Sequence, residues 1–227
     1  MAETIESPSI DAIDRAWQQA DEAAPELHAN SQVPATRRKS KAIQPAHIAP
    51  DIVAFYLSGT LHQTKTPDAQ SKLEALAQDP APYKSKQELL HYTQSFTQLS
   101  HLLTPPLKPA CTTGLCRSLV NAGSHNAFGI RAGGDDAEEY MGYGIWPSAS
   151  YFNHSCSPNV AKKRVGKEWV FRTAREIGMG EECCITYLGG DEKDLDVRDR
   201  RQRLREVWGF ECMCLRCLAE SRACVDT

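Results

Sequence analysis

The sequence predicts an α+β protein in which a helical N-terminal half precedes a β-rich C-terminal half. Apolar residues recur at helical spacing over residues 51–123, whereas short β-branched and aromatic stretches separated by turns follow Gly123. Seven of the nine cysteines lie from Cys156 onward. We therefore expect the chemistry of this protein in its C-terminal third.

Residues 1–50 are predicted to form a weakly ordered lead-in with one helix. Ile10, Ile13, Trp17 and Ala20 follow a helical rhythm after Ser9, and Pro25 is expected to end it. A basic cluster follows, and it is interpreted as either a solvated linker or a nuclear-import signal. Its members are Arg37, Arg38, Lys39 and Lys41.

Residues 51–123 carry the signals of a helical region. Asp51 is expected to cap one helix, and Thr66 to cap another ahead of Pro67. The clearest signal is a capping box from Ser85 to Glu88, which opens a helix that stops before Pro105. A further short helix is predicted over 113–121. The apolar faces of these helices are interpreted as packing surfaces.

Strands and turns dominate after Gly123. Strands are predicted over 126–131, 160–164, 168–173 and 183–187, with turns at 133–136 and 178–180. The second and third strands form a hairpin with the basic residues Lys162, Lys163, Arg164 and Lys167, interpreted as a solvated surface or as a face for an acidic partner. A charged helix over 196–207 precedes the cysteine-rich end. The predicted divisions are therefore 1–50, 51–123, 124–190 and 191–227.

Charge and hydropathy exclude several classes of protein. The 26 Lys and Arg against 29 Asp and Glu leave a net charge of -3, which favours neither nucleic acid nor anionic membrane as a partner. A mean hydropathy of -0.47, without a long apolar run, argues against a membrane span. The first twenty residues lack the pattern of a secretion signal. We expect an intracellular protein of the nucleus or cytoplasm, and the pattern predicts no oligomeric state.

Three cysteines within six residues indicate a metal site. Cys212, Cys214 and Cys217 gather more thiols than one short segment normally holds without a metal. Tetrahedral zinc takes four ligands, and Cys156, in a dense polar cluster, is a candidate for the fourth. The alternative is a set of buried free thiols.

Two other catalytic interpretations fit the residues poorly. His154 and Cys156 suggest a thiol hydrolase, but they are only two residues apart and no third orienting residue is identifiable nearby. Gly178 and Gly180 suggest a dinucleotide loop, but Cys183 stands at the third glycine position and a strand follows.

Three motifs in order resemble the SET-domain protein-lysine methyltransferases. They are GYGIWPSASYFNHSCSPN at 142–159, GEECCITY at 180–187, and WGFECMCLRC at 208–217, which is similar to the zinc-binding post-SET segment. The SET-and-MYND subfamily is the most similar, because a helical insertion precedes its cofactor strand. The resemblance covers about 51–220, and it is strong from Asn126 onward.

The resemblance implies a SET-type fold, S-adenosylmethionine as cofactor and one zinc ion. It implies that Tyr187 is catalytic and that Phe128 and Trp208 line the lysine channel; a tyrosine is more usual at the second place, so the number of methyl groups stays open. The implied cofactor residues are Asn126, Ser150, Asn153, His154 and Phe210. The implied zinc ligands are Cys156, Cys212, Cys214 and Cys217. The implied partner is a protein substrate, with its lysine on a histone or another protein.

The sequence also departs from the family pattern. No glycine-x-glycine turn precedes Asp51, and no cysteine precedes Cys111 to form a MYND finger. We therefore expect the 227-residue chain alone to bind S-adenosylmethionine weakly and to show little methylation, as a truncated gene product would. The alternative function is a non-catalytic, zinc-stabilised protein-interaction module derived from a SET domain.

Overall fold

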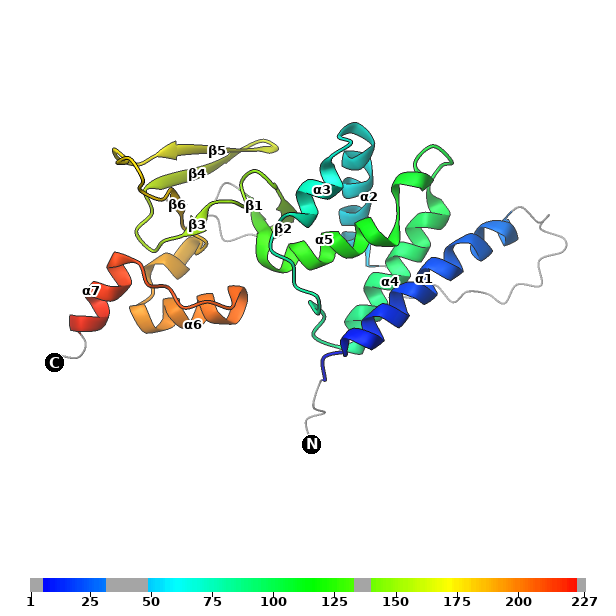
Figure 1. Cartoon of the computed structure of the whole chain (residues 1–227), viewed down its shortest axis with the longest axis horizontal. Coiled ribbons are helices and arrows are strands. Elements are labelled where there is room, and N and C mark those ends of the chain that lie inside the picture. Colours follow the sequence, from blue (N-terminus) through cyan, green and yellow to red (C-terminus); the bar gives the residue numbers. More distant parts are fainter. Residues whose placement is uncertain (1–5, 32–48, 133–139, 224–227) are drawn as a thin grey trace. The chain divides into compact units, whose positions relative to one another are not determined.

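A computed structural model describes residues 6–31, 49–132 and 140–223 of the chain. It divides into two compact units, Met1–Gly123 and Ser124–Thr227. Helices make up the first unit, and short strands with two helices make up most of the second (Figure 1). Within the described ranges, no helix has the length and apolar character needed to cross a membrane. The basic cluster at 37–41, the turn at 133–136 and Cys224 lie outside these ranges.

Within residues 6–31 and 49–132, six helical segments are present, and the last of them leads into the second unit. In chain order they are α1 (Ile10–Ser31), α2 (Pro50–Lys65), α3 (Ala69–Glu74), α4 (Lys86–Leu102), a 3-10 helix (Lys108–Ala110) and α5 (Thr113–Asn126).

The apolar face predicted for the first helix packs against α4. Ile13, Trp17 and Ala20 are buried. The Trp17 indole Nε1–H donates to the Tyr83 hydroxyl at 2.9 Å, and the Trp17 ring lies against Phe96 with centroids 6.1 Å apart. This packing supplies most of the stability of a helix, because propensity alone is weak.

The predicted end of this helix at Pro25 is wrong, since α1 continues to Ser31. A proline inside a helix removes one hydrogen bond of the ladder and crowds the preceding turn. The neighbouring Ala23, Ala24 and Leu27 are strong helix formers, and they favour continuation of the helix.

Two of the predicted N-caps are displaced. α2 begins at Pro50, which is preorganised for a first helical position, so Asp51 lies in the first turn and caps nothing. Its carboxylate still favours the positive end of the helix dipole. Thr66 follows the end of α2, and α3 begins only at Ala69.

The N-terminus predicted for the third helix of this region is confirmed. The Ser85 hydroxyl accepts the backbone N–H of Glu88 at 3.0 Å. The Glu88 carboxylate, however, accepts the N–H of Lys84 at 2.6 Å and not that of Ser85. The side chains of Leu89 and Leu99 are buried, as the apolar rhythm predicted.

α5 runs through Gly123, where the sequence predicted a stop, and β1 starts one residue later than expected. A glycine inside a helix costs about 1 kcal/mol relative to alanine, which does not by itself end a helix. Ala122 and Asn126, on either side of Gly123, are both buried. Their packing favours the longer helix.

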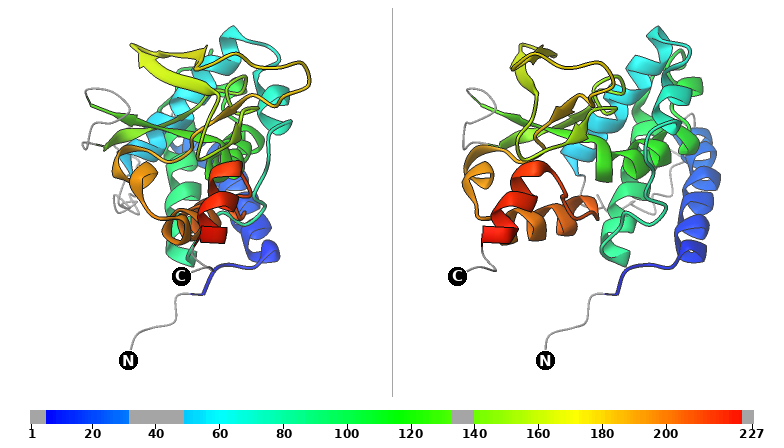
Figure 2. Two further views of the ribbon diagram at one scale, coloured as in Figure 1. Left: turned by 90° about the vertical axis from the view of Figure 1, so that its left-hand side faces the viewer. Right: turned by 60° about the vertical axis from the view of Figure 1, so that its left-hand side comes forward.

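The described part of the second unit contains three two-stranded sheets. β1 (Ala127–Arg131) pairs antiparallel with β2 (Tyr140–Ile145), and β4 (Val160–Val165) pairs antiparallel with β5 (Glu168–Thr173). β3 (Asn153–His154) pairs in parallel with β6 (Cys184–Ile185), beside β4 (Figure 2). The predicted hairpin is confirmed, and its turn uses Gly166 at a φ of 61°.

The strand predicted over 183–187 is shortened to Cys184–Ile185. Its flanking backbone groups bind side chains in place of a neighbouring strand. The Cys184 N–H donates to the Asn159 side-chain oxygen at 2.8 Å, and the Tyr187 N–H donates to His154 Nδ1 at 2.9 Å. These two bonds end the ladder on each side.

The C-terminal segment consists of a 3-10 helix (Gly190–Asp194), α6 (Val197–Trp208) and α7 (Leu215–Ala223). The predicted charged helix is present, with Asp196 as its N-cap: the carboxylate accepts the Asp199 N–H at 2.9 Å. Gly209, at a φ of 75°, ends α6 in the left-handed conformation that glycine adopts without strain. The chain then turns back toward the loop after β3.

Candidate active site and metal centre

Four cysteines from two distant segments meet in one cluster. Cys156 follows β3, Cys212 and Cys214 precede α7, and Cys217 lies in α7. Their four Sγ atoms all lie within 4.8 Å of one another, with 3.5 Å between Cys156 and Cys217 and 3.8 Å between Cys156 and Cys212. Metal–sulfur bonds of about 2.3 Å in a tetrahedron require sulfurs about 3.8 Å apart. The residues present therefore fit a tetrahedral thiolate metal site.

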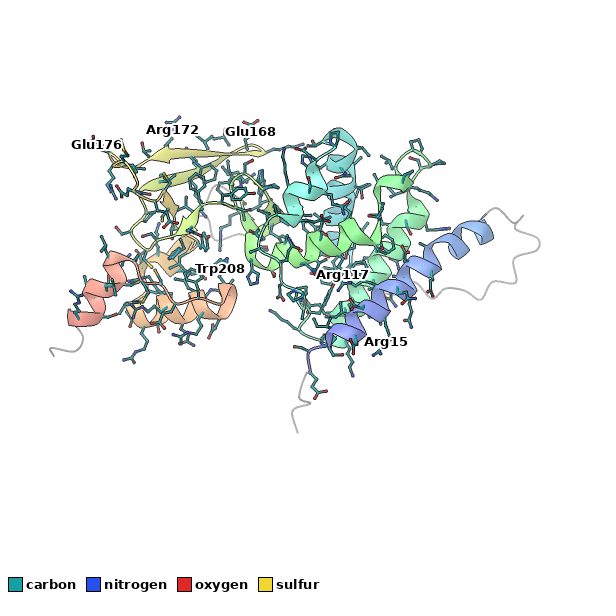
Figure 3. The ribbon with its side chains drawn as sticks, viewed as in Figure 1. Arg15, Arg117, Glu168, Arg172, Glu176 and Trp208 are labelled. Carbon is teal, nitrogen blue, oxygen red and sulfur yellow. The ribbon has the colours of Figure 1, made fainter. Side chains whose placement is uncertain are left out.

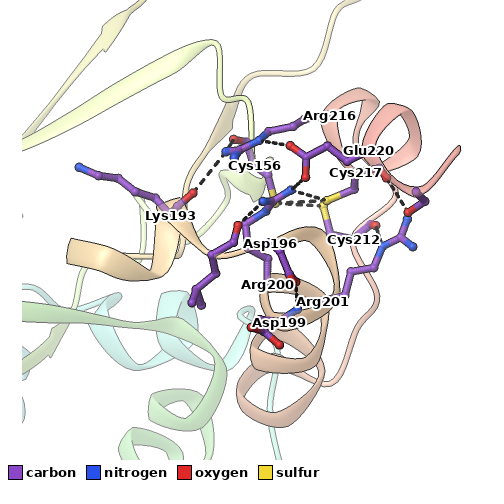
Figure 4. A network of polar contacts seen from close by, with 12 residues as sticks. Cys156, Lys193, Asp196, Asp199, Arg200, Arg201, Cys212, Arg216, Cys217 and Glu220 are labelled. Carbon is purple, nitrogen blue, oxygen red and sulfur yellow. Dashed lines mark hydrogen bonds and ion pairs between the residues drawn. The ribbon is translucent and has the colours of Figure 1, made fainter. Parts of the chain in front are cut away.

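A buried arginine lies against this cluster (Figure 4). Arg200, on α6, is 1% exposed, and its guanidinium donates to Cys217 Sγ at 3.8 Å, to the Glu220 carboxylate at 2.6 Å and to the Leu195 carbonyl. Its Nε has no partner among the described residues. A buried cation beside four thiols compensates the negative charge that the thiols carry once they are deprotonated.

Two further arginines bind the backbone of the cysteine segments. Arg201 Nε donates to the Cys212 carbonyl at 3.0 Å. Arg216 donates to the Cys156 carbonyl at 3.3 Å and to Glu220 at 2.8 Å. The Arg216 bond joins the two ligand segments, and the Arg201 bond attaches the Cys212 segment to α6; both bonds are present without a metal.

Sequence reasoning missed Arg200, although its position carried a signal. The apolar residues of α6 recur at Val197, Leu204 and Trp208, and Arg200 falls on the same helical face. A charged residue within an apolar stripe is unusual and indicates a buried partner.

The environment shifts the pKa values of the thiols in different directions. Burial is the main cause that raises the pKa of Cys156 and the pKa of Cys212, the latter to about 11. Burial also opposes ionisation of Cys214, but hydrogen bonds from the Cys217 and Cys156 backbone and from neighbouring thiols lower its pKa to about 6. A bound metal ion would favour the thiolate form at all four positions.

His154 links the metal centre to the aromatic part of the site. Its Nδ1 accepts the Tyr187 N–H, so Nε2 carries the ring proton and lies 3.3 Å from Cys156 Sγ. The two side chains do meet, contrary to the spacing argument against a Cys/His pair. Burial and the nearby Lys162 and Arg200 lower the pKa of His154 to about 4, which makes the imidazole a poor base for a buried thiol.

The Tyr187 ring packs against both apolar clusters of the unit. Its hydroxyl donates to the Phe152 carbonyl at 2.8 Å. Burial raises the pKa of Tyr187, with Cys184 and Glu182 adding to the shift. The phenol therefore stays protonated at neutral pH, with its proton directed at Phe152 and its oxygen lone pairs left to accept.

Three more rings surround Tyr187 on the side of the cysteine cluster. The centroid of His154 is 5.2 Å away, that of Trp208 is 5.4 Å and that of Phe210 is 6.3 Å. Trp208 is the last residue of α6 and is labelled in Figure 3. The structure thus brings four of the residues expected at the site into one aromatic group.

The remaining expected residues occupy neighbouring positions. The Asn153 side chain is exposed and donates to Glu182 at 2.6 Å. The Ser150 hydroxyl donates a hydrogen bond to the Asn126 carbonyl oxygen at 3.4 Å. Phe128 belongs to a second apolar cluster, with Trp146 and Trp169 as ring neighbours, and this cluster shares Tyr187 with the first.

Comparison with known proteins places residues 22–188, more than half of the chain, in the family described as the SET domain. The potential protein lysine methyltransferase SET6 of Saccharomyces cerevisiae is 39% identical over 135 residues, which are 58% of this chain and 36% of that protein.

Two further relatives are named histone-lysine N-methyltransferases. SET5 of Yarrowia lipolytica is 48% identical over 80 residues, which are 34% of this chain and 18% of that protein. SMYD3 of Homo sapiens is 38% identical over 82 residues, which are 36% of this chain and 18% of that protein. The chain thus spans 36% or less of the length of these three relatives.

Proposed function

Because this chain belongs to the SET-domain family, we propose that it takes part in the transfer of a methyl group from S-adenosylmethionine to a lysine side chain of a protein. The observation that carries the proposal is the aromatic group around Tyr187, whose member His154 directly follows the exposed Asn153 in the chain. The names of the relatives support the same class of reaction.

The proposed cofactor site is the surface beside β3. The cofactor supplies, when bound, an electrophilic methyl group on a positively charged sulfur. The Asn153 amide offers a donor and an acceptor, and the Phe210 ring, 6.0 Å from that of His154, offers an aromatic face for an adenine. Asn126 and Ser150, joined by a hydrogen bond, complete the proposed set.

The proposed channel residues assist deprotonation of the incoming lysine. A lysine amine has a pKa of about 10.4 in water and attacks only as the neutral base. Trp208 and Phe128 belong to the two apolar clusters that share Tyr187, and apolar surroundings disfavour the ammonium form by desolvation. The neutral amine would then accept the methyl group that bound S-adenosylmethionine would supply, with the electron pair of the methyl–sulfur bond remaining on sulfur and the surplus amine proton going to solvent.

Tyr187 is proposed to position the methyl group. Because its hydroxyl donates to the Phe152 carbonyl, its oxygen presents lone pairs, which accept weak C–H hydrogen bonds from a polarised methyl. Alignment of nitrogen, methyl and sulfur is the main requirement of an in-line transfer. A fixed acceptor beside the methyl therefore contributes to catalysis without exchanging a proton.

Substitution of the tyrosine tests this role. In a preparation that methylates a histone mixture, Tyr187→Phe is expected to lower turnover by at least about 100-fold while the cofactor dissociation constant changes little. Tyr151→Phe, which alters a tyrosine that is 68% exposed, is the matched control. An unchanged turnover for Tyr187→Phe would remove the catalytic role.

Binding of the cofactor separates the proposal from its alternative. We expect weak binding by the chain alone, detectable by photo-crosslinking of labelled S-adenosylmethionine and lost in Asn153→Ala. A zinc-loaded, folded protein without any such crosslink would favour the non-catalytic interaction module. Calorimetric binding at micromolar concentration or tighter, with turnover, would show that the glycine turn is not needed.

We also propose that the cysteine cluster holds one zinc ion. The fit of four sulfurs to a tetrahedron supports it, and the ion would join the Cys212–Cys217 segment to the loop after β3. Elemental analysis of protein purified without chelator should give one zinc per chain, lost in Cys214→Ser and kept in Cys183→Ser, whose thiol is exposed. Zinc retained at full stoichiometry and stability in Cys214→Ser would contradict this.

The proposed partner is a protein whose lysine, on a histone or elsewhere, receives the methyl group. A location in the nucleus or cytoplasm belongs to this proposal, because thiolate ligands stay reduced there.

A further inference from the structure

Two aromatic rings of the second unit lie against a lysine of the same chain, and a third ring packs against both of them. Phe128 and Trp169 lie 5.4 Å apart, and Trp146 packs edge-on against both, at 6.1 Å and 6.0 Å. The Lys162 Nζ is 5.4 Å from the Phe128 centroid and 5.6 Å from that of Trp169. The ammonium therefore lies over two aromatic faces at once, within the range of about 6 Å in which such faces attract cations.

The register of the β4–β5 hairpin directs this lysine inward. Lys162 is opposite Phe171, two residues from the buried Val160 and on the same face. Lys163, opposite Val170, lies on the other face and is exposed. The solvated surface expected for the whole hairpin is therefore wrong for Lys162, because alternation along a strand separates neighbouring side chains.

The chemistry of the three rings suits ammonium groups in general. Aromatic faces attract a desolvated cation by about 0.5 to 2 kcal/mol, and they prefer alkylated ammonium groups, which lose less hydration. Trp169 adds a donor, since its buried Nε1–H has no acceptor among the described residues. The Lys162 side chain cannot supply this acceptor, because an ammonium group only donates hydrogen bonds.

We propose that Phe128, Trp146 and Trp169 form a binding site for an alkylammonium group, lysine or methylated lysine, and that Lys162 occupies this site as an internal ligand. An external peptide that carries such an ammonium group replaces Lys162, and a carbonyl oxygen of that peptide accepts the Trp169 N–H. Arg164, next along the same face of β4, is about 7 Å away along the strand, and its positive charge favours departure of Lys162.

The site shares Phe128 with the proposed lysine channel, so its link to methylation rests on the proposed function. The binding of an ammonium group at this site does not depend on the proposed function. Occupancy by Lys162 would make a substrate lysine compete with an internal one, which lowers its apparent affinity by the fraction of the protein in which the site is filled.

The test is a titration followed by tryptophan fluorescence, without S-adenosylmethionine. The probe is choline, and its neutral isostere 3,3-dimethylbutan-1-ol is the control for apolar binding. Lys162→Met is expected to bind choline about 10-fold more tightly than the wild type, a difference of about 1.4 kcal/mol. Lys162→Gln should do the same, whereas Lys163→Met, on the opposite face, should match the wild type.

Each result bears on the proposal. Trp169→Leu combined with Lys162→Met should lose choline binding while keeping its zinc content and thermal midpoint, which shows that the unit is folded. Equal choline affinity in Lys162→Met, Lys162→Gln and wild type, no binding in any of them, or equal binding of the neutral isostere would overturn the proposal. Choline binding in a protein that gives no crosslink to labelled S-adenosylmethionine would remove the proposed function and leave this site standing.

Discussion

Replacing Arg200 with methionine removes a positive charge that is buried beside the cysteine cluster and leaves an unbranched side chain in its place. The guanidinium makes charge-assisted contacts to Cys217, Glu220 and the Leu195 carbonyl. One such bond contributes about 1.5 to 3 kcal/mol, and removing one partner of a buried pair costs about 3 to 5 kcal/mol. Glu220 is 37% exposed and keeps its bond to Arg216, so the lower end of that range applies. We expect a loss of about 3 kcal/mol.

The same substitution should weaken metal binding. Four thiolates with one divalent ion carry a net charge of about -2, and Arg200 offsets half of it inside the protein. Loss of a neighbour that stabilises the ligands typically lowers metal affinity by about 10- to 100-fold. Without metal, the raised pKa values of Cys156 and Cys212 keep these two thiols protonated, so Arg200→Met should cost less stability in chelator than in zinc.

Chemical denaturation in zinc and in chelator measures the first effect, and competition with a chromogenic chelator measures the second. Arg203→Met is the matched control: Arg203 lies on the same helix, 45% exposed, and pairs with Glu192 at 2.7 Å. Such a surface pair contributes about 0 to 1 kcal/mol. Equal losses in the two variants, or unchanged zinc affinity in Arg200→Met, would refute the argument that Arg200 compensates the cluster.

Three further outcomes are expected. Hydrogen bonds from Arg175, from the Gly178 backbone N–H and from the Asn159 side-chain amide lower the pKa of Glu181 to about 2. The stabilising contribution of Glu181 is therefore present above the unfolded value of about 4.5 and disappears as pH falls toward 2; carboxyl chemical shifts across a pH titration measure this. Gly209→Ala places a side chain at a φ of 75° and should cost about 1 kcal/mol in urea denaturation. Tyr83→Phe removes the acceptor of the buried Trp17 N–H and should cost about 1 to 3 kcal/mol by the same measurement.

Each of these outcomes has a control. A Glu181 midpoint near 4.5 would contradict the ion pair with Arg175. Gly178→Ala, where an added Cβ meets only a carboxylate oxygen at 4.0 Å, should leave stability unchanged, and an equal loss there would remove the argument from φ. Tyr140→Phe, at a tyrosine that is 57% exposed, should likewise be neutral.

Local signals in the sequence predicted several elements well. The Ser85 cap, the hairpin around Gly166 and the charged helix over 196–207 each depend on neighbouring residues whose preferences agree. Where a local signal competes with packing, the prediction failed: Pro25 and Gly123 both lie inside helices. Propensity costs of a few kcal/mol are small beside the burial of an apolar face.

The sequence by itself determined the composition of the site: the three closely spaced cysteines, the motif around Asn153 and the family to which they belong. Spacing along the chain identified these features because their members are close together. The tertiary structure decided that Cys156 joins the other thiols and that Arg200 lies buried against them. It also decided that Lys162 lies over aromatic rings, because such contacts join distant segments whose approach depends on the packing of the whole unit.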